Sequence, residues 1–134
     1  MQFYTIIMEK ERLNLNLLDE FQQYNFSKIR ETNIFLVGSA RFKEYFIKIE
    51  SILQIKFNKM VYMCSVDGLL NKTEFSADEW DKLQQIALRK LHFHDAILVL
   101  DIDNYIGEQS SEEIKYFKEV INKPVYLLSQ LRYD

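Results

Sequence analysis

The 134-residue chain contains few residues that interrupt or cross-link regular structure: 1 cysteine, 1 proline and 3 glycines. So little proline and glycine, together with 48% hydrophobic and 14% aromatic residues, argues against disorder and indicates one globular domain with a single core. The lone Cys64 excludes an intramolecular disulfide and a cysteine-rich zinc site, which favours a reducing, cytoplasmic compartment. His92 and His94 have no third ligand near them in the sequence, so we expect no metal site.

The chain also lacks a strong excess of one charge and any long apolar run. A formal net charge of -3 at pH 7 gives no general attraction to duplex nucleic acid or to an anionic membrane. The apolar run near the start, FYTIIM, is too short for a signal peptide, and no later run approaches the length of a membrane span. We therefore expect a soluble cytoplasmic protein that has neither partner.

Residues 1–32 differ in pattern from the rest and are expected to form an N-terminal extension, mostly helical. The run FYTIIM is compatible with a short strand. Apolar side chains at helical spacing follow and predict a peripheral helix of about five turns: Leu13, Leu17, Leu18, Phe21 and Tyr24. We expect this helix to pack on the core or on a second subunit.

From Asn33 onward, apolar runs alternate with amphipathic segments. The runs predicted to be strands are NIFLVG (33–38), MVYMCSV (60–66), AILVL (96–100) and PVYLL (124–128), and the predicted helices are 40–57, 77–93 and 111–122. Ser76 and Glu79 form a capping box before the second of these helices. The alternation predicts that residues 33–134 form a flavodoxin-like three-layer α/β sandwich, with parallel strand order 2-1-3-4 and room for a fifth strand.

This strand order brings two loops together where the order of the strands reverses. In the first loop, Gly38 permits a tight turn, Ser39 can cap the next helix, and the free N–H groups with Arg41 could bind an anion such as phosphate. The second loop follows a buried strand and is rich in acids and polar residues: Asp101, Asp103, Asn104, Tyr105, Glu108, Gln109 and Glu113. Acids in one crevice raise one another's pKa, so one can stay protonated while another is charged. A solvated polar loop is the alternative interpretation.

The stretch GEQSSEEIKYF (107–117) has two interpretations. Ser110 as N-cap and Glu113 three residues later fit a capping box, which local folding alone explains. The same spacing places the Glu113 carboxylate in the first turn of a helix, where the partial positive charge would keep it ionised, as a carboxylate nucleophile must be. The stretch by itself does not decide between them.

Three segments together resemble a known family: NIFLVGSARFKEYF, LRKLHFHDAILVLDIDNYIGEQSSEEIKYF and NKPVYLL. In order and spacing they are similar to the nucleoside 2-deoxyribosyltransferase-like proteins, notably the small phage and bacterial branch, over about residues 33–128. The resemblance implies a flavodoxin-like fold and cleavage of the base–sugar bond of a nucleoside or nucleoside monophosphate, by hydrolysis or transfer, without a metal or organic cofactor. It also implies a homodimer or a higher homo-oligomer.

Carried over residue by residue, the resemblance makes Glu113 the nucleophile that attacks the anomeric carbon. Asp103 or Asp101 is the candidate proton donor, chosen from its position in the loop, because a retaining mechanism needs an acid near the departing base. Tyr105 is a candidate to stack on a base. The candidate substrate-binding residues are Gly38, Ser39, Arg41, Asp101, Tyr105, Gly107 and Ser110.

The chain departs from the family pattern at several positions. Gln109 replaces the usual serine, and Asp103 and Asn104 stand where a glycine pair is common. Ala87 occupies a site where relatives often have histidine, and Phe117 replaces a small alanine. These departures bear on turnover and base choice more than on the fold. They leave a noncatalytic nucleotide-binding or regulatory module of the same fold as the alternative.

Overall fold

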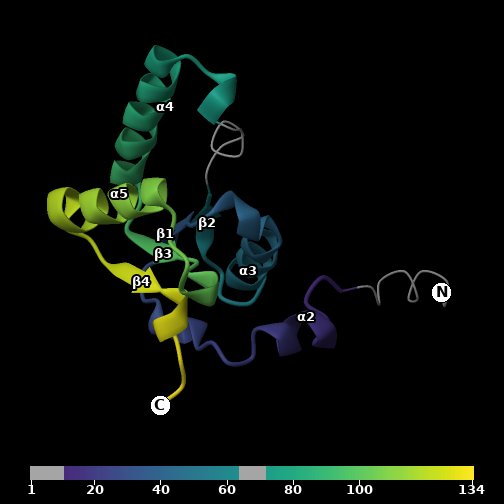
Figure 1. Cartoon of the computed structure of the whole chain (residues 1–134). Coiled ribbons are helices and arrows are strands. Elements are labelled where there is room, and N and C mark those ends of the chain that lie inside the picture. The colour runs from purple at the N-terminus through teal and green to yellow at the C-terminus, as the bar shows by residue number, and fades with distance from the viewer. Residues whose placement is uncertain (1–10, 64–71) are drawn as a thin grey trace, which may run out of the picture.

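The structure, a computed structural model, describes residues 11–63 and 72–134 (Figure 1). The strand expected at FYTIIM and the end of the second expected strand, residues 64–66, lie outside this part of the chain. The described residues form an α/β fold of the flavodoxin-like type, with a four-stranded, all-parallel sheet in the order β2-β1-β3-β4. The predicted strand order is therefore confirmed.

The central strands are the most deeply buried part of the sheet. The strands are β1 (Asn33–Val37), β2 (Met60–Tyr62), β3 (Ala96–Val99) and β4 (Val125–Leu127). Every residue of β3 is buried, because the strand lies between β1 and β4 and helices cover both faces of the sheet. Burial of β3 on both faces of the sheet explains the unbroken apolar run in the sequence.

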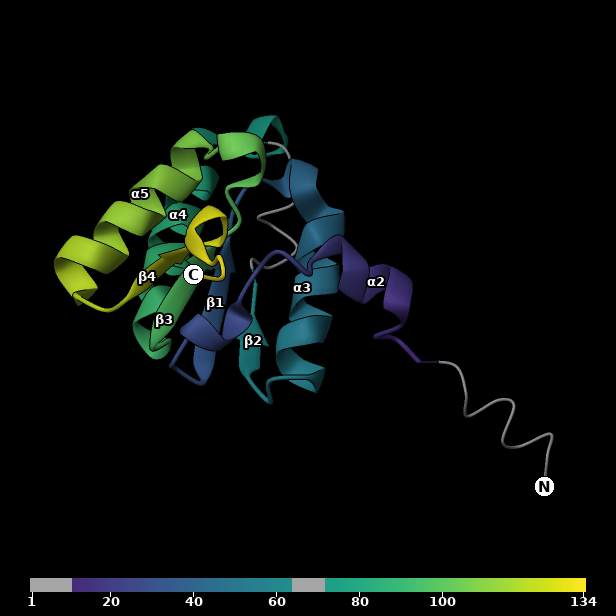
Figure 2. The ribbon, with the colours of Figure 1, turned by 90° about the horizontal axis from the view of Figure 1, so that it is seen from below.

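Helices lie on both sides of the sheet. The long helices are α3 (Lys43–Ile55), α4 (Ala77–Lys90) and α5 (Glu108–Tyr116). Figure 2 shows α3 on one face of the sheet and α5 on the other. None of the helices within residues 11–63 and 72–134 is both long and apolar enough to cross a bilayer.

The predicted capping box of α4 is present in both directions. The Glu79 N–H donates to Ser76 Oγ at 3.1 Å, and the Ser76 N–H donates to Glu79 Oε1 at 2.9 Å. These bonds satisfy two of the N–H groups that have no partner within the helix. The start of α4 is therefore fixed by residues that are neighbours in the sequence.

The helix of about five turns expected in the N-terminal extension is not formed. A six-residue helix, α2 (Leu15–Glu20), is followed by a separate 3₁₀ turn (Phe26–Lys28). Four apolar side chains of this segment enter the same core as β1 and β3: Leu17, Phe21, Phe26 and Ile29. Their spacing therefore reflects burial against the core along a bent chain.

Specific hydrogen bonds attach this N-terminal segment to the sheet. Lys59 Nζ donates to the carbonyls of Ile29 at 3.0 Å and Glu31 at 2.7 Å. The Tyr126 hydroxyl donates to Glu31 Oε1 at 2.7 Å. The Asn25 N–H donates to the Leu131 carbonyl at 2.7 Å. The segment thus covers the sheet on the side of α3, whose buried side chains belong to the same core.

Candidate active site

The carboxyl ends of β1 and β3 lie side by side. The Leu100 N–H donates to the Val37 carbonyl at 2.7 Å, so the chain leaves both strands at the same level. A Cβ on Gly38 would lie 3.1 Å from the Leu100 carbonyl oxygen and 3.1 Å from a ring carbon of Phe46. Gly38 has no positive φ, so the close approach of Leu100 and Phe46 is what requires a glycine here.

The loop after β1 continues directly into a helix. Ser39 Oγ accepts the Arg41 N–H at 3.3 Å and caps a 3₁₀ turn (Ala40–Phe42) that runs into α3. Ser39 therefore has the capping role expected from the sequence, although the first turn of the predicted helix is 3₁₀.

A pocket of about 220 Å³ lies between this loop and the start of α5. The loop contributes Gly38, Ser39 and Ala40, and β1 contributes Phe35 to its apolar wall. The other side is formed by residues at the start of α5: Gly107, Glu108, Ser110 and Glu113. The structure thus brings together five of the residues that the sequence singled out: Gly38, Ser39, Gly107, Ser110 and Glu113.

The expected capping box of α5 is wrong. The helix begins at Glu108 with Gly107 as its N-cap, because the Ser111 N–H donates to the Gly107 carbonyl at 2.9 Å. Ser110 is therefore inside the helix, where it is buried. Glu113 lies in the second turn, so the partial charge of the helix terminus, which acts mainly within the first turn, is not centred on it.

Glu108 is a second acid in this pocket; from the sequence it was expected only as one of the polar residues of the loop, with no catalytic or binding role. It occupies the first turn of α5 and lines the pocket that Glu113 also lines. Its position directly after Gly107 was the available signal, since an acid often follows the N-cap of a helix. The pocket is therefore lined by carboxylates from two successive turns of one helix.

Asp101 has a structural role that the sequence did not reveal. Its side chain is buried, and its Oδ1 accepts the Ser129 N–H at 2.9 Å while its Oδ2 accepts the Ser129 hydroxyl. The carboxylate thus ties the end of β3 to the turn that follows β4. Asp101 and Asp103 line a different pocket, of about 330 Å³, with Arg132. Neither expected proton donor lies in the pocket of Glu113.

Asp103 and Asn104 form a sharp turn with unusual backbone angles. Their φ values are 54° and 59°, in the left-handed region that favours glycine. Aspartate and asparagine are the other residue types that tolerate this region. The pair can therefore replace a glycine pair in this loop without changing its path.

Arg41 and Tyr105 join the two loops outside the pocket. The Arg41 guanidinium carbon lies 4.1 Å from the centre of the Tyr105 ring, a cation–π geometry. Neither residue is part of the pocket lining. The Tyr105 hydroxyl would nevertheless lie 4.0 Å from a Cβ on Gly107, so the ring stands next to the pocket.

The described residues contain no group of three or more His, Cys, Asp or Glu side chains arranged to hold a metal ion. The chemistry available to the pocket from these residues is that of two carboxylates, a hydroxyl and backbone amides. Comparison of the chain with protein-family models, with curated proteins and with solved structures finds no match.

Proposed function

We propose that the protein cleaves the N-glycosidic bond of a nucleoside or nucleoside monophosphate, as a hydrolase or a 2-deoxyribosyltransferase, with Glu113 as nucleophile. The observation that carries the proposal is that Glu113 lines one pocket with the Gly38 to Ala40 loop. The motifs that resemble nucleoside 2-deoxyribosyltransferase-like proteins contribute these same two segments. The sequence resemblance and the shared pocket thus point to the same two segments.

The pocket size suits the sugar part of such a substrate. Its volume of about 220 Å³ is below the roughly 300–1,000 Å³ that encloses a whole drug-sized ligand. A pentose therefore fits inside, while the base extends toward the outside. Tyr105, next to the pocket, is in a position to stack on that base.

In the proposed reaction, a Glu113 carboxylate oxygen attacks the anomeric carbon of the sugar. The bond between this carbon and the base nitrogen breaks, and its electron pair leaves with the base. Asp103, an expected proton donor, does not line this pocket, so the departing base would take its proton from solvent water or from Glu108, which does line it. Water or a second base then attacks the same carbon and releases Glu113, which retains the configuration of the sugar.

The loop after β1 would hold the other end of the sugar. Gly38, Ser39 and Ala40 line the pocket opposite α5, and the polar groups that they carry are the Ser39 hydroxyl and the backbone amides. Backbone amides and hydroxyls bind phosphate oxygens well, so the loop suits a 5′-phosphate. The proposal therefore predicts that monophosphates are bound more tightly than nucleosides.

The direct test is to incubate the protein with a panel of nucleosides and their 5′-monophosphates and to measure the released free base by chromatography. Glu113→Gln should abolish the release, because an amide cannot act as the nucleophile. Glu112→Gln is the matched control: it removes the same charge from the neighbouring residue, which is exposed and does not line the pocket. Full activity in Glu113→Gln would eliminate this mechanism.

A noncatalytic nucleotide-binding module gives a different result in the same experiments. Nucleotides would raise the melting temperature without any release of base. That stabilisation would persist in Glu113→Gln and fall in Ser39→Ala, because Ser39 lines the pocket and Arg41 does not. This pattern would replace the proposed catalytic function with a binding one.

A further inference from the structure

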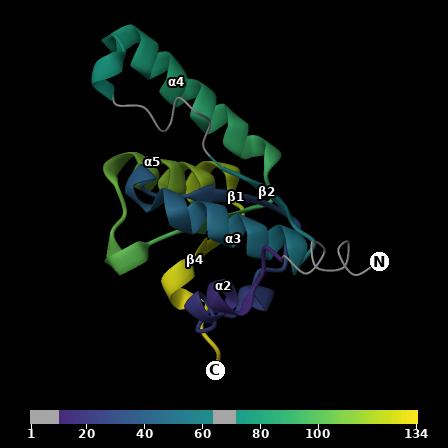
Figure 3. The same cartoon turned by 90° about the vertical axis from the view of Figure 1, so that its right-hand side faces the viewer.

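Helix α4 is poorly covered by the other residues that the structure describes. None of its 14 residues is buried, whereas the 13-residue α3 buries four: Phe46, Ile49, Ile52 and Leu53. Figures 1 and 3 show α4 reaching away from the sheet and from α5. Its attachment to the core is at its C-terminal end, where Leu88 packs against the core and Leu91 is fully buried. Among residues 11–63 and 72–134, therefore, little covers this helix, and most of its surface can contact another molecule.

One line of side chains on this helix has an unusual arrangement. Glu79, Leu83, Ile86 and Lys90 follow at intervals of four, three and four, which places them on one face. Ile86 is 42% exposed, and both charged side chains are exposed. The line thus has two aliphatic residues in the middle, an acid at one end and a base at the other.

This arrangement is complementary to itself when a second α4 runs in the opposite direction. A twofold axis midway between residues 83 and 86 brings each Leu83 against the Ile86 of the second copy. The same axis brings each Glu79 against the Lys90 of the second copy, so the ion pair forms twice. A parallel pairing would instead bring like charges together, which is unfavourable.

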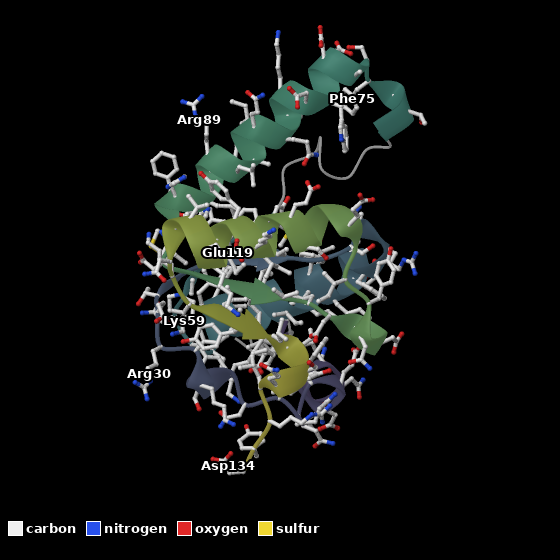
Figure 4. All side chains as sticks on the ribbon, turned by 60° about the vertical axis from the view of Figure 1, so that its left-hand side comes forward. Arg30, Lys59, Phe75, Arg89, Glu119 and Asp134 are labelled. Carbon is white, nitrogen blue, oxygen red and sulfur yellow. The ribbon has the colours of Figure 1, made fainter. Side chains whose placement is uncertain are left out.

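The ends of the helix extend the same surface. Phe93 is 77% exposed one turn beyond Lys90, an unusual position for a large aromatic side chain. At the opposite end, Phe75 packs against Trp80 with ring centres 5.7 Å apart, and Figure 4 shows Phe75 beside the start of α4. In the antiparallel pair, Phe93 of each copy lies near Phe75 of the other.

We propose that two copies of this chain associate through the line Glu79, Leu83, Ile86 and Lys90 of α4, with the two helices antiparallel. The proposal stands on the exposure and charge order of α4 and is independent of the proposed catalysis. An interface built on one helix from each copy is small, so we expect a reversible dimer with a Kd on the order of 10 μM.

Sedimentation equilibrium of the full chain over a range of concentrations tests this proposal. The wild type should approach twice the chain mass of 16.2 kDa as concentration rises. Glu79→Lys and Lys90→Glu should each raise the Kd by about tenfold or more, because each sets like charges against each other twice. An equal mixture of the two variants should regain the dimer, because both ion pairs then form between unlike chains.

A matched control separates this contact from general effects of charge. Asp81→Lys makes the same change as Glu79→Lys on the opposite side of the helix and should leave the Kd unchanged. Circular dichroism checks the folding of Glu79→Lys, which also loses a capping bond, while Lys90→Glu leaves the cap intact. A wild type that stays monomeric overturns the proposal. So does a dimer that the single variants do not weaken or that the mixture does not restore.

Discussion

Arg41 lies over the ring of Tyr105, with 4.1 Å between the guanidinium carbon and the ring centre. The ring of Phe42 meets the same tyrosine edge to face at 6.2 Å. Arg41 and Phe42 come from the loop after β1, and Tyr105 comes from the loop after β3. The two loops beside the candidate active site are therefore held together by contacts to one aromatic ring.

The coupling between Arg41 and Tyr105 can be measured by a double-mutant cycle. An exposed cation–π contact contributes about 0.5–1 kcal/mol, so Arg41→Ala and Tyr105→Leu should show a coupling energy of this size. The measurement is the free energy of unfolding in urea for the wild type, both single variants and the double variant. Additive effects of the two single variants would show that the contact contributes nothing in solution.

Gly38→Ala and Gly107→Ala should have different effects on stability, although both residues line the pocket. The new Cβ at residue 38 meets backbone and ring atoms at 3.1 Å, whereas the new Cβ at residue 107 meets only the Tyr105 side chain, at 4.0 Å. We expect Gly38→Ala to lower the free energy of unfolding by about 1–3 kcal/mol. Gly107→Ala should cost less, about 0.5–1 kcal/mol, because its methyl group meets only ordinary contacts and the cost is that of a poorer N-cap for α5. Equal melting temperatures for the two variants would contradict this expectation.

Asp101→Asn should destabilise the protein, and Asp103→Asn should not. The first substitution removes the charge from a buried carboxylate that accepts two hydrogen bonds from Ser129, which costs about 1–3 kcal/mol. The second changes an exposed side chain to another residue type that tolerates the left-handed backbone of Asp103. Urea unfolding of the two variants provides the comparison. A larger loss in Asp103→Asn would rule out the structural role assigned to Asp101.

The stability of the protein should decrease in mild acid because of His94. Burial lowers the pKa of this histidine below its ordinary value of 6.5, and Lys123 lowers it further, while Asp95 partly opposes them. The unfolded chain therefore binds a proton at a higher pH than the folded one does. Stability from this group is fully present above pH 6.5 and is lost as the pH falls below that value.

Urea unfolding at pH values above and below 6.5 measures this effect. His94→Phe keeps a ring between Phe35 and Tyr62, whose ring centres lie 4.9 and 4.8 Å from that of His94. The variant also loses the His94 bond to Asn33, so its free energy of unfolding should be lower than that of the wild type. It should, however, lack the further loss of stability that protonation of His94 causes in acid. The dependence should persist in His92→Gln. If His94→Phe and the wild type have the same pH dependence, another group is responsible.

The strands and their order could be predicted because the causes are local or topological. Ala96 to Val99 form an apolar run since both faces of β3 are covered, and short crossovers limit the order in which parallel strands can pair. The capping box of Ser76 and Glu79 could be predicted because both partners lie within one turn. The conformation of the N-terminal segment could not be predicted, because its helical spacing comes from contacts with distant residues such as Leu131.

The candidate site was predicted in part for the same reasons. Topology brings the loops after β1 and β3 together, so the pocket shared by Gly38 and Glu113 follows from the strand order. The start of α5 could not be predicted, because a serine followed three residues later by an acid matches the capping-box pattern even when both residues lie inside the helix. The structural role of Asp101 could not be predicted either, because its partner Ser129 becomes its neighbour only in the folded chain.

Tyr24 pairs with Arg132 in an isolated antiparallel bridge, so the covering formed by α2 and its following turn closes onto the last turn of the chain. On the ribosome, the aromatic side chains of this early segment are made long before their partners emerge. Until Leu128 and Leu131 have left the ribosome, Phe21 and Phe26 have no complete core to enter, and a nascent chain that stalls before residue 128 would present them to chaperones.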